Sequence, residues 1–216
     1  MFERHHAKQQ AEAYRAALAT WQDQRDGLAA ALALAQGFTG DHTAEGLVLK
    51  AGESLFATVT GVGLIEERRA GGHWQGGSSG VSIPVGSLGG RTVRYHVGAS
   101  RGHYVQGTPT PTAIDTGTVF VTDRRVVFTG AAQTRECRFD KLLGYHADAG
   151  STTFSVSNRQ KPTTIHYGAA LDDWFAFRLT LALAHGQGQV PALVGQLQAQ
   201  LAELDARRPA PPPPLP

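Results

Sequence analysis

The spacing of apolar residues changes twice along the chain, from a helical period to a strand period and back. Between residues 5 and 36, apolar side chains recur at alternating intervals of three and four, which places them on one helix face. Arg25 interrupts this series, whose members are Tyr14, Leu18, Trp21, Leu28 and Leu32. Because Gly37 and Gly40 follow, and glycine commonly ends helices, the pattern predicts a long amphipathic helix over residues 5–36.

A strand period begins near residue 46. Apolar residues recur at about every second position from 47 to 64, which predicts strands there. Residues 71–80 are rich in glycine and predict a flexible loop, and Pro84 limits residues 81–85 to a short edge strand. We expect a further strand pair at 92–97 and 102–106, and single strands at 135–139 and 142–146.

Two β-hairpins have the clearest local signals. Residues 117–130 form two β-rich runs around the polar turn Asp123-Arg124, and residues 152–157 and 163–167 flank a second polar turn. We expect Asp123 to close the first turn by bonding to its own backbone. Arg125 should either lie across the strand surface or pair with a carboxylate. The residues expected to face a core are Val119, Val121, Val126 and Phe128.

The helical period returns after residue 168. Residues 169–185 predict a helix with apolar residues around much of its circumference, and residues 191–206 predict a last helix with a heptad seam. The seam consists of Val190, Val194, Leu197, Leu201 and Leu204. The two amphipathic seams either cover each other within one chain, pair between chains, or each pack on the sheet. The proline-rich residues 209–216 predict an extended tail.

The first hairpin also resembles a known family. Its string Thr122-Asp123-x-Arg125-Val126-Val127-Phe128, preceded by Gly117, resembles the central hairpin of bacterial PH-like and GRAM-like domains. The resemblance implies a bent antiparallel sheet or open barrel capped by a C-terminal helix. It also implies a binding or assembly module that is not an enzyme and holds no cofactor. The acidic pair Glu66-Glu67 stands near where lipid-binding members are basic.

These signals together predict an α+β fold with helices added at both ends of a PH-like domain. The expected divisions are an amphipathic helix at 1–40, the β domain with its capping helix at 46–186, the heptad helix at 187–208 and the tail at 209–216.

Composition narrows the kinds of partner. The chain has 216 residues and a formal net charge of +2, which gives no reason to expect strong attraction to nucleic acid or anionic membranes. Cys137 is the only cysteine, so it can form no disulfide within the chain. Neither a signal peptide nor an apolar run of about 20 residues is present. We therefore expect a cytoplasmic protein, with peripheral membrane attachment as the alternative.

Residues 76–80 match the G-x-S-x-G string of serine hydrolases, with Ser78 and Ser79 as candidate nucleophiles. That chemistry needs a strand, a sharp turn and then a helix, so that the serine stands over an oxyanion hole. The residues that follow, Val81-Ser82-Ile83-Pro84, predict no helix. The string therefore indicates a loop, and catalysis at it is the least favoured hypothesis.

A second candidate group is polar and basic. Histidine can titrate or bind a metal, but a metal site needs three or four converging ligands, and no third ligand is in suitable spacing. We predict no metal. The candidate binding residues are His73, Trp74, Arg91, Arg94, His96, Arg101 and His103.

Three functions follow from these observations. The leading hypothesis is a module that binds a protein partner or associates with itself, through the seams or the candidate binding residues. The second is binding to a membrane or lipid. The third is hydrolysis by Ser78 or Ser79.

Overall fold

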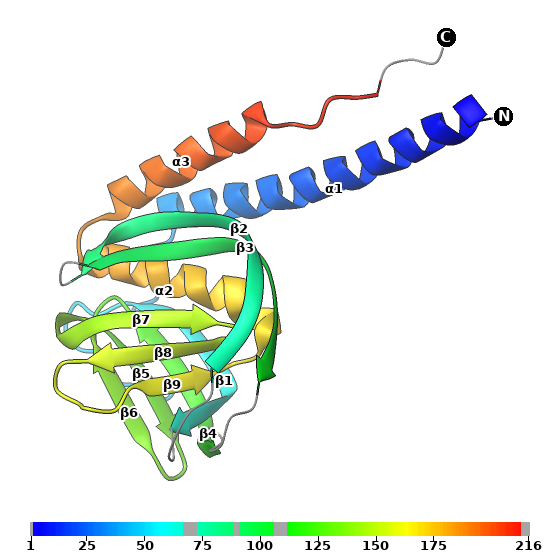
Figure 1. Ribbon diagram of the computed structural model, residues 1–216. Coiled ribbons are helices and arrows are strands. Elements are labelled where there is room, and N and C mark those ends of the chain that lie inside the picture. Colours follow the sequence, from blue (N-terminus) through cyan, green and yellow to red (C-terminus); the bar gives the residue numbers. More distant parts are fainter. Residues whose placement is uncertain (1, 67–72, 89–90, 106–111, 213–216) are drawn as a thin grey trace. The chain divides into compact units, whose positions relative to one another are not determined.

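The computed structural model describes residues 2–66, 73–88, 91–105 and 112–212, and it divides the chain into two compact units (Figure 1). The first unit contains Met1–Gly37 and Val194–Pro216, and the second contains Phe38–Leu193. One unit is therefore built from two segments that are far apart in the sequence, and the other from the continuous segment between them.

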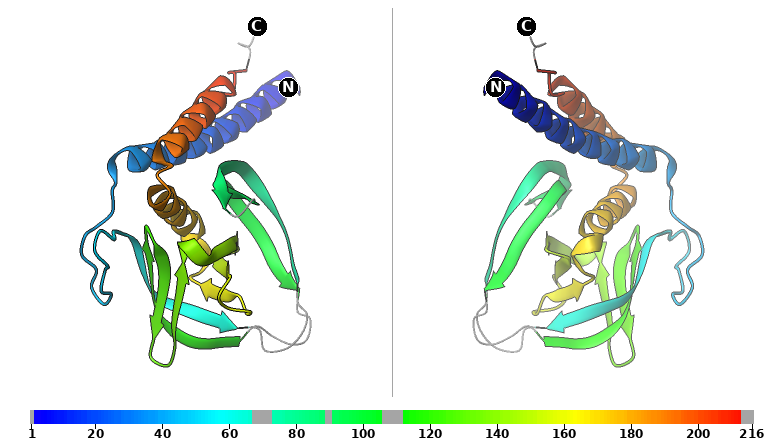
Figure 2. Two further views of the ribbon diagram at one scale, coloured as in Figure 1. Left: turned by 90° about the vertical axis from the view of Figure 1, so that its left-hand side faces the viewer. Right: turned by 90° about the vertical axis from the view of Figure 1, so that its right-hand side faces the viewer.

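The second unit contains a seven-stranded antiparallel sheet in the order β6-β5-β4-β1-β9-β8-β7. The first and last strands in sequence, β1 and β9, are neighbours at its centre, and β6 also comes close to β8, so the sheet is strongly curved (Figure 2). Its strands are β1 (Leu55–Glu66), β4 (Thr112–Thr122), β5 (Arg125–Gly130), β6 (Thr134–Arg138), β7 (Leu142–Asp148), β8 (Ser151–Val156) and β9 (Thr163–His166). The α+β expectation is confirmed.

Both predicted hairpins are present as β4–β5 and β8–β9. The β4–β5 pair keeps register from Gly117 opposite Gly130 to Val121 opposite Val126. The four side chains expected to face a core are each at most 1% exposed. Burial of apolar side chains at every second position is what fixes the register of this hairpin.

A helix after the last strand completes the core. The predicted helix begins with the 3₁₀ turn η2 (Ala169–Leu171) and continues as α2 (Asp172–Gly186). It packs against β1, β4 and β7 of the sheet and also contacts β2 and β3 (Figure 2). Phe175, Leu179 and Leu181 are fully buried. Contacts on more than one side explain why its apolar residues surround much of the helix.

The opposite face of the β4–β5 hairpin is also buried, which the sequence pattern did not predict. Phe120 and Val127, which alternate with the core residues, are 2% and 4% exposed. The segment at residues 38–54 covers them with three apolar side chains, Ala44, Leu47 and Leu49. A β-bridge between Asp41 and Leu55 holds the beginning of this segment against β1.

The glycine-rich region differs from the expectation. Residues 73–80, expected to be a loop, belong to β2 (His73–Leu88), and the two strands expected between 92 and 106 are one strand, β3 (Arg91–Val105). The two pair antiparallel along their whole length. Strand pairing uses backbone groups, so glycine weakens it without preventing it. Pro84 is accommodated at a register shift between Pro84 and Gly86.

The first unit contains α1 (Phe2–Gly37) and most of α3 (Val190–Ala206), which confirms both predicted terminal helices. The two helices run antiparallel (Figure 1). Among the described residues, no helix is both long enough and apolar enough to cross a membrane.

Candidate functional site

The β4–β5 turn is held by Thr122, and the expectation for Asp123 is wrong. The Thr122 hydroxyl oxygen accepts the backbone N–H groups of Arg124 at 3.2 Å and Arg125 at 3.0 Å. The Asp123 carboxylate instead accepts the N–H of Ser54 at 3.0 Å, and the Asp123 N–H donates to the Ser54 carbonyl at 3.1 Å. A local bond was available to either residue, but the neighbouring 38–54 segment offers Asp123 a partner distant in sequence.

Arg125 pairs with a buried carboxylate, the second of the two roles expected for it. Its Nε and Nη2 donate to the two oxygens of Glu53 at 2.8 and 3.0 Å, and its Nη1 donates to Glu136 at 3.1 Å. The Glu53 side chain has no exposed surface, and it also accepts the Thr122 hydroxyl at 2.7 Å and the Lys50 N–H at 2.7 Å. Bidentate geometry and complete hydrogen bonding are what allow a charged pair to be buried.

The pKa values of this pair follow from its surroundings. Burial alone would raise the pKa of Glu53, but its hydrogen bonds from Arg125, Lys50 and Thr122 outweigh burial and lower it. The hydrogen bond to Glu53 is the main cause of the raised pKa of Arg125. Both groups therefore remain charged in the folded chain over the neutral range.

Beside this pair lies a hollow of about 290 Å³, which we call the turn pocket. Four parts of the chain meet there: the 38–54 segment, the β4–β5 turn, the end of β6 with the following 3₁₀ turn η1 (Phe139–Lys141), and the last residue of α2. The Phe139 N–H donates to the Arg124 carbonyl at 2.8 Å and holds η1 against the turn. The lining residues are Lys50, Asp123, Arg124, Arg125, Arg138, Phe139, Asp140 and Gly186.

The basic side chains that line the turn pocket differ in whether a carboxylate lies close to them. Arg138 makes two bonds to Asp140, at 2.9 and 2.7 Å, and that hydrogen bonding lowers the pKa of Asp140. Lys50 is 3.4 Å from Glu136. Arg124 is exposed and donates to the Gly52 carbonyl at 2.9 Å, and among the described residues it pairs with no carboxylate. Arg124 is thus the cation best placed to receive an external anion.

Two apolar side chains also lie at or near the turn pocket. The side chain of Val48 is 87% exposed, and the Val48 carbonyl accepts Arg125 Nη2 at 3.0 Å, which places it next to the turn. Phe139, half-buried, lines the pocket itself. The combination can hold a carboxylate while an adjacent apolar group packs on Val48 or Phe139.

Few of the residues that line the turn pocket could be recognised from the sequence. Glu53, Lys50 and Phe139 are not among the candidate binding residues that the sequence predicts. Only the spacing Arg138-x-Asp140 is a local signal of an ion pair. Glu53 lies 72 positions before Arg125, and no spacing rule connects them.

The candidate binding residues lie on the β2–β3 hairpin and are spread along it. His73 and Trp74 pair with Val105 and Tyr104 at one end, and Arg91 pairs with Leu88 at the other. Arg94, His96, Arg101 and His103 lie between, opposite Pro84, Ser82, Gly77 and Gln75. At about 3.3 Å per residue, His96 and His103 are about 23 Å apart along the strand, too far to bind one metal ion.

The hydrolase string is part of a strand. Ser78 and Ser79 pair with Ser100 and Ala99 in the middle of β2 and β3. A nucleophile elbow requires its serine at a turn between a strand and a helix, whereas Ser78 and Ser79 lie in the middle of a strand. Among the described residues, no group of three or more His, Cys, Asp or Glu side chains could hold a metal ion.

The residues of the two seams contact one another within the chain. The Trp21 indole N–H donates to the Leu204 carbonyl at 2.8 Å, and Arg25 pairs with Asp205 at 2.9 Å. Leu28 and Leu197 are buried, and Tyr14, Leu18, Leu32, Val194 and Leu201 are half-buried. Arg25, which interrupts the apolar series, thus occupies a seam position because α3 supplies its counter-charge.

Cys137 is a buried strand residue, 1% exposed, and burial raises the pKa of its thiol. A thiol that is neutral and inaccessible is a poor nucleophile. We expect Cys137 to react with a chromogenic disulfide reagent only as the chain unfolds, so that the rate rises steeply across the urea transition. Rapid reaction of the folded chain would contradict this placement.

Comparison of the chain with family models, curated proteins and solved structures yields no match.

Proposed function

We propose that this chain is a non-enzymatic, PH-like protein-binding module whose turn pocket holds an acidic side chain of a partner. The observation that carries the proposal is Arg124, an exposed residue that lines the turn pocket together with Lys50 and Phe139 and pairs with no carboxylate among the described residues. An arginine fork recognises a carboxylate with two parallel hydrogen bonds, and arginine is enriched at protein interfaces.

The fold supports the same proposal independently. A curved antiparallel sheet followed by a packed helix is the arrangement that the resemblance of the β4–β5 hairpin implies. Thr122 and Arg125 of that hairpin bond to Glu53 and so hold the 38–54 segment, which forms one wall of the turn pocket. A rigid wall matters because a preorganised site loses less entropy when it binds.

Reversing one charge tests the proposal. We expect Arg124→Glu to reduce capture of the partner at least tenfold in pull-downs from a cell extract, because it places a like charge opposite the partner's carboxylate. Lys161→Glu is the matched control, since Lys161 is also exposed but lies in the β8–β9 turn. Both variants should keep the free energy of unfolding within about 0.5 kcal/mol of wild type, as exposed positions usually do.

Equal capture by wild type and both variants would contradict the role of the turn pocket. Two further measurements separate the other functions. Light scattering of the purified chain shows whether a second copy is the partner. Co-sedimentation with phosphatidylserine vesicles at low salt tests the membrane alternative, and binding there without any protein partner would overturn the proposal.

A further inference from the structure

The two helices of the first unit differ greatly in length. α1 has 36 residues and α3 has 17, which correspond to about 54 Å and 26 Å. The bonds from Trp21 to Leu204 and from Arg25 to Asp205 fix the end of α3 near Trp21. About 20 residues of α1, on the N-terminal side of Trp21, therefore extend beyond the end of α3.

The apolar series of α1 nevertheless stays covered beyond that end. Ala11, Tyr14 and Leu18 are half-buried, whereas the residues between them, such as Arg15 and Ala16, are exposed. The same spacing of three and four thus separates covered from uncovered positions on both sides of Trp21. Some part of the chain other than α3 must cover this stretch.

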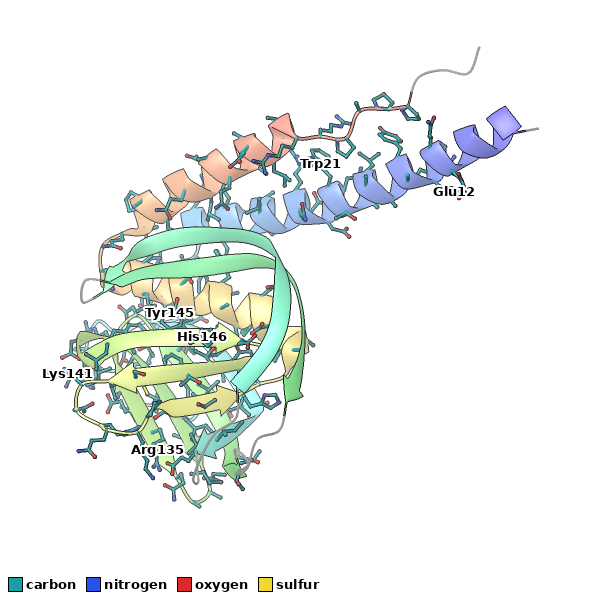
Figure 3. The ribbon with its side chains drawn as sticks, viewed as in Figure 1. Glu12, Trp21, Arg135, Lys141, Tyr145 and His146 are labelled. Atoms are coloured by element: carbon teal, nitrogen blue, oxygen red, sulfur yellow. The ribbon has the colours of Figure 1, made fainter. Side chains whose placement is uncertain are left out.

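The segment after α3 is in the right place to do so. A turn at Arg207 and Arg208 ends α3, and the chain to residue 212 continues outside any helix or strand. Figure 3 shows this path running along α1 from Trp21 toward Glu12. The Arg208 guanidinium lies over the Trp21 ring, 5.4 Å from its centroid. Pro209 and Pro212 are half-buried, while Ala210 and Pro211 are exposed.

That burial pattern has the period of a polyproline II helix, which turns once in three residues. The length also matches. Four polyproline II steps from Arg208 to Pro212 span about 12 Å, and seven helical steps from Trp21 to Tyr14 span about 11 Å. Pro212 therefore reaches the level of Tyr14 if Arg208 lies at Trp21. Aromatic side chains that project from a firm surface are what proline-rich ligands bind in known recognition grooves.

We propose that α1 carries a binding groove for proline-rich segments, formed by Tyr14, Leu18 and Trp21, and that residues 207–212 occupy it in cis. The ligand class is a polyproline II segment preceded by arginine, which adds a cation–π contact with Trp21. This groove is separate from the turn pocket and does not depend on the function proposed for it. Tethering keeps the local concentration of the tail in the millimolar range, so a free proline-rich segment binds only when it displaces the tail.

The test uses the full chain with a nitroxide label attached through Ala210→Cys. Ala210 is exposed, and the buried Cys137 should remain unlabelled, with wild type taken through the same labelling as the background. We expect the label to broaden the amide NMR signals of residues 9–15, which lie beyond the end of α3. Adding a peptide of sequence Arg-Arg-Pro-Ala-Pro-Pro, that of residues 207–212, at several millimolar should restore these signals by displacing the tail.

Two variants of the labelled chain identify the groove. Tyr14→Ser with Leu18→Ser should restore at least half of the lost signal, whereas Arg15→Ser with Ala19→Ser, on the exposed side of α1, should restore none. Pro209→Gly with Pro212→Gly alters only the tail and should release it equally, which covers the case in which the α1 variant misfolds. Broadening that is absent from the start, that persists in the groove and tail variants, or that the peptide does not reverse overturns the proposal.

Discussion

Replacing Arg125 with methionine should lower the free energy of unfolding by about 3–5 kcal/mol, because it leaves the Glu53 carboxylate buried without its counter-charge. Methionine keeps most of the apolar stem, so the loss reports the charge and its hydrogen bonds. Urea unfolding followed by circular dichroism measures the change. Arg138→Met is the control, because Arg138 and Asp140 are each 51% exposed, and such pairs contribute about 0–1 kcal/mol.

A double variant separates the contribution of the ion pair from the cost of burying a single unpaired charge. Arg125→Met combined with Glu53→Met removes both charges, and we expect it to recover much of the stability lost in Arg125→Met, since an apolar pair of similar volume often replaces a buried ion pair at little cost. If Arg125→Met alone unfolds no more easily than Arg138→Met, Glu53 does not depend on Arg125 as the geometry implies.

The Glu53–Arg125 pair also makes the free energy of unfolding depend on pH in the acid range. Glu53 has a folded pKa below its ordinary value of 4.5, so the unfolded chain takes up this proton first as the pH falls. The stabilisation is complete above pH 4.5 and is lost as the pH falls through the lowered folded pKa. Glu53→Gln, which does not titrate, should flatten this part of the pH profile.

Gly117→Ala should destabilise the chain by about 2–3 kcal/mol, because the added Cβ would collide with the backbone of the facing strand. The atoms in its way are the Thr129 carbonyl and the Gly130 Cα. Backbone atoms in a paired strand cannot rotate aside as a side chain can. The thermal midpoint and the urea midpoint should both fall.

Gly144→Ala provides the matched comparison, because Gly144 also lies in a strand but a Cβ there meets nothing within 4 Å. We expect its effect to be near zero or slightly stabilising, since alanine restricts the unfolded chain more than glycine does. Equal effects of the two substitutions would show that the close approach at Gly117 is not tight.

The spacing of apolar residues was sufficient to predict the elements that have a clear period of their own. The first hairpin and the terminal helices follow from spacings of two, three and four, because one face of each shows the period of its own element. The period does not show whether another segment packs on the opposite face of an element. By alternation, Phe120 and Val127 should face outward, and the 38–54 segment explains their burial. The strand period of Leu47 and Leu49 in that segment predicts a strand, but the strand begins only at Leu55.

The glycine-rich region shows a different limit. Composition there indicates weak local preference for any strand, but β2 and β3 are determined by each other, since each supplies the backbone partners of the other. The turn pocket could not be predicted for a similar reason. It arises where four segments meet, and Lys50, Arg124 and Arg138 share no pattern in the sequence.

The two helices of the first unit are synthesised at widely separated times. Trp21 bonds to a residue that is synthesised 183 positions later. At 5–20 residues per second, about 10–40 s pass between the two events. During this interval α1 presents an aromatic seam without its partner helix, while the whole sheet is made and can fold. In a polysome, neighbouring nascent chains present the same uncovered seam to one another during this interval.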